Sequence, residues 1–174
     1  MLCEIRFRFL LPIAQTFSAA IFGGVGLWQR HHILSQPWLG DQTMWETTAR
    51  FHVWPWPFKF AVLTNVPAFL AGALVEWPIE SVWSSIPEWI ACLPSLAFVP
   101  LLWYWVGARF DAKLQASRRK YWMLMLAFTA VCGLGLLVPG HVSYIPYGVL
   151  VWLVFTVVAK RRGAQDKLLL PTTR

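Results

Sequence analysis

The chain is poor in charged residues, which make up 13% of its 174 positions. A soluble domain usually carries about 25% charged residues, because its surface must be hydrated. Hydrophobic residues account for 57% of the chain, and the mean hydropathy is +0.53. So little charge indicates that much of the surface contacts something other than water, and the composition predicts a membrane protein.

Cysteine is scarce as well, with only Cys3, Cys92 and Cys132. No two of them form a CxxC pair, so the sequence predicts neither a disulfide framework nor a structural zinc site. Cys92 and Cys132 lie within apolar runs, where the expected role is that of a small buried hydrophobe.

Catalytic and nucleotide-binding signatures are missing from the sequence. It contains no GxSxG, HExxH, GxGxxG or P-loop motif. Within the apolar runs there are no ionisable side chains, apart from Lys59 and the flanking Glu88. Proton relays and intramembrane catalysis need such groups, so an enzyme or an autonomous pump is disfavoured. We assign no cofactor and no catalytic, cofactor-binding or metal-binding residue from the sequence.

The formal net charge is +7. Positive charge indicates nucleic-acid binding only when it forms a stripe on a folded surface, and here Lys and Arg cluster beside the apolar runs. We therefore expect no nucleic acid as a partner. We expect the lipid bilayer, with anionic headgroups at the basic connector 107–120 and the basic tail 160–174.

Four apolar runs are long enough to span about 30 Å of hydrocarbon, which takes roughly 20 helical residues. Within lipid every backbone amide must be satisfied internally, which favours helices. The predicted fold class is an all-α, polytopic transmembrane helical bundle that forms a single membrane domain over residues 1–174. The four full spans are expected at about residues 9–28, 90–106, 121–138 and 144–159.

A fifth apolar run, residues 58–75, is interrupted by Asn65-Val66-Pro67. Proline removes a backbone donor and clashes with the preceding helical turn, and asparagine in hydrocarbon needs a hydrogen-bond partner. Two structures fit this pattern. One is a kinked fifth span, and the other is a shorter helix that lies in the interface or enters the membrane and returns.

The distribution of Lys and Arg fixes the orientation of the last three spans. If residues 58–75 do not cross, the N-terminus, the connector and the tail share one side of the membrane. That side then holds twelve of the fifteen basic residues: Arg6, Arg8, Arg109, Lys113, Arg118, Arg119, Lys120, Lys160, Arg161, Arg162, Lys167 and Arg174. If they do cross, the N-terminus and the loop 29–57 exchange sides. Either way, the C-terminus is predicted to be cytoplasmic, in the inner membrane of a bacterium or a comparable cell.

The first apolar run resembles a signal peptide in its basic start, Arg6 and Arg8, and in its small residues Ser18-Ala19-Ala20. The uncharged run continues to Trp28, however, beyond the 7–15 residues typical of a signal's apolar core. We expect an uncleaved anchor.

The loop 29–57 carries four of the twelve tryptophans, Trp38, Trp45, Trp54 and Trp56. Because tryptophan has a large apolar surface, we expect this loop to lie on the membrane surface or against other helices. A short amphipathic helix is predicted within it, over residues 41–50. The loop is also where another membrane protein could dock.

None of the four histidines lies in the middle of a span, which disfavours a haem between the helices. In the four-span topology they share the outer side with several carboxylates, and imidazole and carboxylate are the usual ligands of zinc and iron. The spacing matches no known metal motif, so histidines at the interface are the simpler interpretation. The residues of this outer face are His31, His32, His52, His141, Asp41, Glu46, Glu76, Glu80 and Glu88.

Residues 103–105, Trp-Tyr-Trp, precede Arg109 and Asp111. This pattern is typical of a helix that leaves the bilayer through an aromatic belt. We expect Arg109 to reach the headgroups, Asp111 to pair with Arg109 or Lys113, and Gly107 to let another backbone approach. The alternative is a clamp on a lipid phosphate or on a partner.

Small residues recur at spacings that let helices approach closely in lipid. The pairs are Ala20 with Gly24, Ala19 with Gly23, and Ala68 with Gly72, and Gly133 and Gly135 add two more small positions. They predict close helix packing in the bundle or against a partner.

Three functions remain open from the sequence. The favoured one is a non-catalytic accessory, assembly or scaffold component of the membrane. The first alternative is a transporter or channel subunit, which requires that Gln15, Thr16, Ser18, Thr64 and Asn65 converge on one polar path. The second alternative is a membrane enzyme that uses the outer His/carboxylate face.

Overall fold

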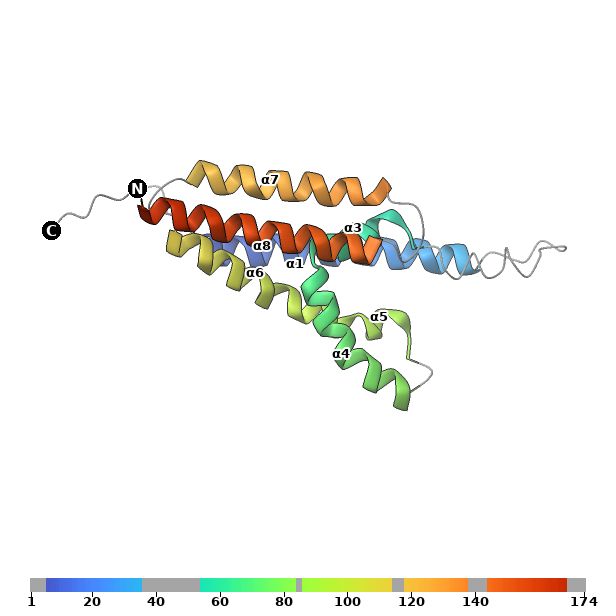
Figure 1. Cartoon of the computed structure of the whole chain (residues 1–174). Helices are drawn as coiled ribbons and strands as arrows, with labels where there is room; N and C mark the ends of the chain where they lie inside the picture. The colour runs from blue at the N-terminus through green and yellow to red at the C-terminus, as the bar shows by residue number, and fades with distance from the viewer. Residues whose placement is uncertain (1–5, 36–53, 84–85, 114–117, 138–143, 169–174) are drawn as a thin grey trace, which may run out of the picture.

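The computed structural model describes residues 6–35, 54–83, 86–113, 118–137 and 144–168. Every regular element in these ranges is a helix, as predicted. The elements are α1 (Phe7–Ser35), α3 (Trp56–Thr64), α4 (Val66–Val82), α5 (Glu88–Ala91), α6 (Leu93–Lys113), α7 (Arg118–Leu134), the short 3-10 helix η1 (Gly135–Leu137) and α8 (Tyr144–Leu168). Four of them, α1, α6, α7 and α8, run alongside one another as a bundle (Figure 1).

Three of the observed helices, α1, α6 and α8, are longer than the apolar runs that predicted them, whereas α7 begins three residues earlier than predicted and gives way to η1 after Leu134. α1 continues to Ser35, so the first part of the predicted loop 29–57 is helical. The predicted connector 107–120 is largely helix, because α6 ends at Lys113 and α7 begins at Arg118. Most of the predicted basic tail also belongs to α8. The predicted helix over residues 41–50 lies outside the described residues.

Length and composition alone do not confirm four full spans. α1 and the segment Trp89–Asp111 are each long and apolar enough to cross a membrane. The pair Trp56–Thr64 and Val66–Ile79 would add a third span if it were counted as one, but it is bent by 99°. Tyr121–Leu137 and Tyr144–Lys160 are apolar but shorter, about 26 Å each at 1.5 Å per residue.

One end of the bundle carries basic residues from several helices, and we call it the basic end. The first residue of α1, Phe7, packs there on Phe110 of α6 at 6.3 Å between ring centroids and on Trp122 of α7 at 5.2 Å. Arg109 of α6 and Lys160 of α8 line one small hollow at the same end. α1 therefore runs antiparallel to α6, and α7 runs antiparallel to α8.

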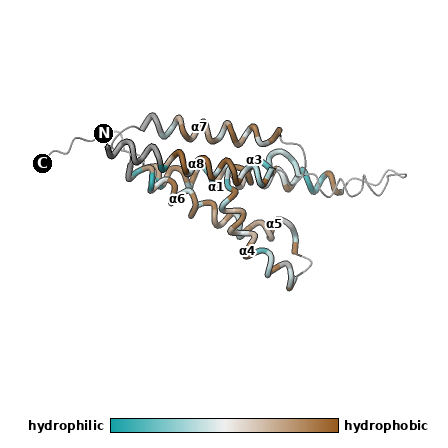
Figure 2. Tube along the Cα trace, viewed as in Figure 1, coloured by the Kyte–Doolittle hydropathy of each residue, from teal (hydrophilic) through white to brown (hydrophobic). Residues whose placement is uncertain are grey.

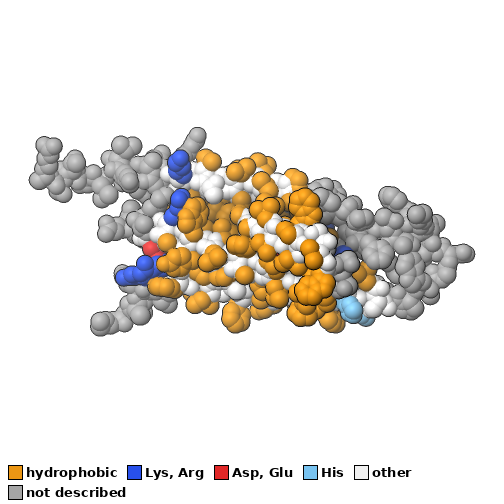
Figure 3. Space-filling model, turned by 90° about the horizontal axis from the view of Figure 1, so that it is seen from below, with side chains coloured by type: hydrophobic (Ala, Val, Ile, Leu, Met, Phe, Trp, Pro, Cys, Tyr) orange, Lys and Arg blue, Asp and Glu red, His pale blue; other side chains and the backbone are white. Residues whose placement is uncertain are grey.

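Much of the outer surface of the bundle is apolar, like its interior. On α1 the buried face contains Phe7, Leu11, Ala19 and Gly26, while the opposite face exposes Phe9, Ile13, Phe17, Ile21, Val25 and Trp28. Figure 2 shows hydrophobic residues along the middle of α7 and α8, and Figure 3 shows one face of the molecule covered largely by hydrophobic side chains. Large apolar helices without a polar outer face are typical of membrane proteins.

Five of the described glycines sit where helices nearly touch, and three of them, Gly72, Gly107 and Gly135, were singled out in the sequence. A Cβ on Gly107 would lie 2.6 Å from the Cα of Arg8, and one on Gly72 would lie 2.4 Å from the Cα of Ser95. A Cβ on Gly135 would lie 2.5 Å from the ring of Tyr147. The predicted close approaches at these positions are confirmed.

At Gly23, Gly24 and Gly133 a Cβ would meet nothing within 4 Å among the described residues, so packing within the bundle does not use these positions, and packing against a partner there stays a prediction. These glycines share the small-residue spacing but face away from the neighbouring helices.

Candidate functional site

The break between α3 and α4 exposes a backbone carbonyl inside the bundle. In a continuous helix the oxygen of Leu63 would accept a hydrogen bond from the amide of residue 67, but that residue is Pro67, which has no N–H. The structure supplies two other donors. Trp152 Nε1 of α8 donates to the Leu63 oxygen at 3.2 Å, and Cys132 Sγ of α7 lies 3.7 Å from it.

Asn65 fills the break itself and is completely buried. Its Oδ1 accepts a hydrogen bond of 2.7 Å from Trp103 Nε1 of α6. Its Nδ2 donates to the oxygen of Ala61 at 2.9 Å and to Thr64 Oγ1 at 3.0 Å. The requirement that a buried amide be hydrogen-bonded is therefore met without water, by groups on α3 and α6.

Aromatic rings enclose this polar break. The Trp103 and Trp152 rings lie 5.6 Å apart, centroid to centroid, in an edge-to-face arrangement, and Phe128 packs on Trp152 at 5.0 Å. Trp103 and Asn65 are both fully inaccessible to solvent. In the part of the chain that the structure describes, the break is thus a sealed structural centre.

The predicted polar path is only partly assembled. Thr64 and Asn65 are buried and in direct contact. Gln15, Thr16 and Ser18 are half-buried on α1, and among the described residues no hydrogen bond joins them to Asn65. α1 instead approaches α3 through Phe22, which packs on Phe60 at 5.3 Å.

Among the described side chains, Asp111 forms no ion pair with Arg109, and the side chain of Lys113, the other predicted partner, lies outside the described part of the structure. Asp111 Oδ1 accepts from the Phe7 amide at 2.9 Å and its Oδ2 accepts from the Arg8 amide at 3.0 Å. The first amides of a helix lack intrahelical partners and attract negative charge, so a carboxylate from α6 caps α1. The Arg109 guanidinium lies 3.8 Å from the Trp105 ring centroid, and Tyr104 and Trp105 are exposed, as the predicted aromatic belt requires. The prediction is wrong for Trp103, which is completely buried because its indole donates to Asn65 inside the bundle.

The end of the bundle opposite the basic end holds two cations that the sequence placed in the loop or near its edge. Arg30 is only 7% exposed, and its guanidinium stacks 4.0 Å above the ring of Trp54. Lys59 Nζ lies 5.7 Å from the ring of Tyr144 at the start of α8. Cation–π contacts of this kind let charged groups lie among apolar side chains.

The outer His/carboxylate face is not assembled among the described residues. No group of three or more His, Cys, Asp and Glu side chains there could hold a metal ion. His31 and His32 are exposed, and Glu76 accepts a hydrogen bond of 2.6 Å from Ser95 Oγ. The other members of the predicted face lie outside the part of the structure that can be described: His52, His141, Asp41, Glu46 and the side chains of Glu80 and Glu88.

The far half of α4 points away from the bundle (Figure 1). Its large apolar side chains are exposed. Leu74 is 75% exposed, Trp77 76%, Val82 87% and Trp83 69%. We call the stretch from Leu74 to Trp83 the α4 arm. Sequence reasoning placed the docking surface in the loop 29–57 and missed this arm, although three tryptophans within residues 77–89 were a visible signal.

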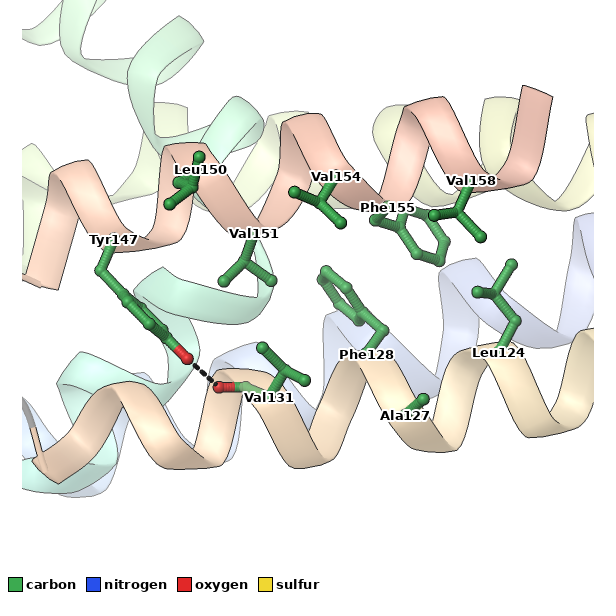
Figure 4. A pocket seen from close by; sticks show the side chains of 10 residues that line it. All are labelled: Leu124, Ala127, Phe128, Val131, Tyr147, Leu150, Val151, Val154, Phe155 and Val158. Carbon is green, nitrogen blue, oxygen red and sulfur yellow. Dashed lines mark hydrogen bonds between the residues drawn. The ribbon is translucent and has the colours of Figure 1, made fainter. Parts of the chain in front are cut away.

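An apolar groove separates α7 from α8 (Figure 4). Its volume is about 320 Å³. Tyr147 closes one end, because its hydroxyl donates a hydrogen bond of 2.6 Å to the oxygen of Val131 across the groove. The lining is aliphatic and aromatic: Leu124, Ala127, Phe128, Val131, Tyr147, Leu150, Val151, Val154, Phe155 and Val158.

Comparison with known proteins finds no match to this chain among protein-family models, curated proteins or solved structures.

Proposed function

We propose that the chain is an integral membrane protein that acts as a non-catalytic component of a larger membrane assembly. The observation that carries this proposal is the α4 arm, whose large side chains are mostly free of contact with the rest of the bundle. Exposed apolar patches of this kind mark sites of contact with another protein or with lipid. An arm that leaves the bundle offers a partner a surface that the bundle does not use.

The proposed topology has four crossings, by α1, α6, α7 and α8. α3 starts beside the end of α1, where the Cβ of Phe58 would lie 2.5 Å from a Cβ on Gly26. α4 then turns away through 99°, so that α3 and α4 enter the membrane and return. In this topology the whole basic end lies on one side of the membrane. The distribution of Lys and Arg supports the cytoplasmic side.

The two alternatives gain less support. A transporter would need a polar group that faces a path, whereas the side-chain polar atoms of Asn65 are engaged within the bundle. A metal-dependent enzyme would need converging ligands, and none converge among the described residues. We therefore retain the accessory or scaffold function as the proposal.

The topology is tested with single cysteines at the two ends of the bundle. His31→Cys and Lys160→Cys place thiols at exposed positions in a background from which Cys3, Cys92 and Cys132 have been replaced by alanine. We expect a membrane-impermeant maleimide to label position 31 on intact cells and position 160 only after permeabilisation. Labelling of both positions from the same side would contradict four crossings.

The partner proposal is tested by native mass spectrometry of the tagged chain, extracted in mild detergent from its own membrane. We expect a heavier complex of fixed stoichiometry. The double variant Trp77→Ala, Trp83→Ala should lose that complex. The control variant Phe17→Ala, Ile21→Ala alters two exposed apolar residues of α1 and should keep the complex. A wild-type chain that purifies alone, or a complex that survives loss of both tryptophans, would contradict the proposal.

A further inference from the structure

The groove between α7 and α8 needs an apolar occupant. It runs from Leu124 and Val158 at the basic end to Val131 and Tyr147 at the closed end (Figure 4). The Tyr147 hydroxyl is the polar side-chain group among its lining residues, and it is engaged by the Val131 carbonyl. In a bilayer such a groove is filled by lipid or by another helix.

The dimensions of the groove favour a lipid chain over a helix. About 16 Å of α8 lies between Val158 and Tyr147, at a rise of 1.5 Å per residue. A partner helix that crosses the membrane is about 30 Å long, so the groove would cover only about half of its length. Tyr147 also blocks its path, because the ring packs against Gly135 while the hydroxyl reaches Val131. A flexible chain that enters from one end fits these constraints.

The open end of the groove leads to concentrated positive charge. Just beyond Val158, α8 continues through the exposed Lys160 and then Arg161-Arg162, and α7 begins with Arg118-Arg119-Lys120. Residues 118–137 and 144–165 contain no acidic residue. The acidic residues that the described helices place at this end are Asp166, farther along α8, and Asp111 of α6, which accepts hydrogen bonds from the Phe7 and Arg8 amides. In Figure 3, most of the Lys and Arg side chains visible on that face gather at one end, where one acidic patch is also visible, and the middle of the face is largely apolar.

Arg109 adds to this charge from a third helix. It lines a hollow of about 90 Å³ together with Lys160, and Phe155 separates this hollow from the groove. The stack of Arg109 on Trp105 fixes its guanidinium at the basic end. A phosphate at the mouth of the groove therefore has basic side chains on both α6 and α8 within the same small region.

We infer that the groove binds one acyl chain of an anionic phospholipid, whose phosphate lies at the basic end beside Lys160. The inference rests on the membrane insertion of α7 and α8 proposed above. Basic clusters are attracted to anionic membranes in general. The inference goes further, because it places one retained lipid at a defined position.

The test is native mass spectrometry of the full chain with added phosphatidylglycerol or phosphatidylcholine of identical acyl chains. We expect one phosphatidylglycerol to remain bound under activation that removes phosphatidylcholine. Lys160→Gln should reduce the preference for phosphatidylglycerol about fivefold, the effect of one basic group near a lipid surface. Ala127→Phe should fill the groove and abolish the retention of phosphatidylglycerol.

The matched control is Ala130→Phe, the same change at an exposed position of α7 that does not line the groove. It should retain phosphatidylglycerol as the wild type does. Equal retention by Ala127→Phe and Ala130→Phe, or no retained lipid on the wild type, would overturn the inference. The thiol labelling described above reports separately on membrane insertion, so a failed lipid site with intact topology is distinguishable from a failed topology.

Discussion

The indole of Trp103 on α6 donates a hydrogen bond of 2.7 Å to the side-chain oxygen of Asn65, 38 residues earlier in the chain. Both side chains are completely buried. This bond ties α6 to the point where α3 ends and α4 begins. It explains how an asparagine and a proline are tolerated within an apolar run.

Loss of the Trp103–Asn65 bond should destabilise the protein in a coupled manner. Trp103→Phe leaves Oδ1 of Asn65 unpaired, and Asn65→Ala leaves the Trp103 indole unpaired. We expect each change to cost about 1–2 kcal/mol, and a double-mutant cycle to give a coupling of about 0.6–1.7 kcal/mol. Unfolding by SDS from detergent micelles measures this. The control Trp89→Phe changes an exposed tryptophan and should have little effect. If the losses from Trp103→Phe and Asn65→Ala simply add in the double variant, the bond contributes nothing to stability.

Trp152→Phe should weaken the same region through the backbone. The variant keeps a ring near Phe128 and Phe155 but removes the donor to the Leu63 carbonyl, leaving only the weak Cys132 thiol at 3.7 Å. We expect a loss of about 1 kcal/mol. Hydrogen exchange should rise in α3 and in the first turn of α4. Unchanged exchange there would mean that the carbonyl needs no replacement donor.

Asp111 should stabilise the start of α1. Asp111→Ala leaves the Phe7 and Arg8 amides without their acceptor, with an expected cost of about 1 kcal/mol, as for other helix caps. Asp111→Asn keeps one acceptor oxygen and should fall between Ala and the wild type. Faster amide exchange confined to the N-terminal peptide is the expected signature. The control Arg109→Gln alters a neighbouring exposed residue. If Arg109→Gln raised amide exchange in the N-terminal peptide as much as Asp111→Ala does, that result would argue against capping.

The glycines should separate into two groups when changed to alanine. Gly107→Ala places a methyl group against the backbone of Arg8 and should cost about 1–3 kcal/mol, as overpacking does. Gly24→Ala meets open space and should be neutral or stabilise by up to about 1 kcal/mol through helix propensity. Thermal unfolding in detergent compares the two. A similar loss at both positions would contradict the close approach of α1 and α6.

Several features of the chain follow from the sequence because they depend on local composition. The scarcity of charge and the long apolar runs predict helices suited to a membrane, since lipid leaves the backbone few alternatives. The interruption at Asn65-Val66-Pro67 predicts a break, because proline cannot donate within a helix. The predicted ends of the helices are less accurate, since amphipathic stretches such as residues 29–35 extend the helices beyond their apolar parts.

Other features were decided only by the tertiary structure, because they join residues far apart in the chain. The sequence shows that Asn65 needs partners, but only the packing of α6 and α8 selects Trp103 for its side chain and Trp152 for the Leu63 carbonyl. Asp111 has two basic neighbours in sequence, yet it caps α1, because unpaired amides at a helix start attract a carboxylate that the bundle brings within 3 Å. The sequence therefore determined which groups require partners, and three-dimensional proximity determined which partners they received.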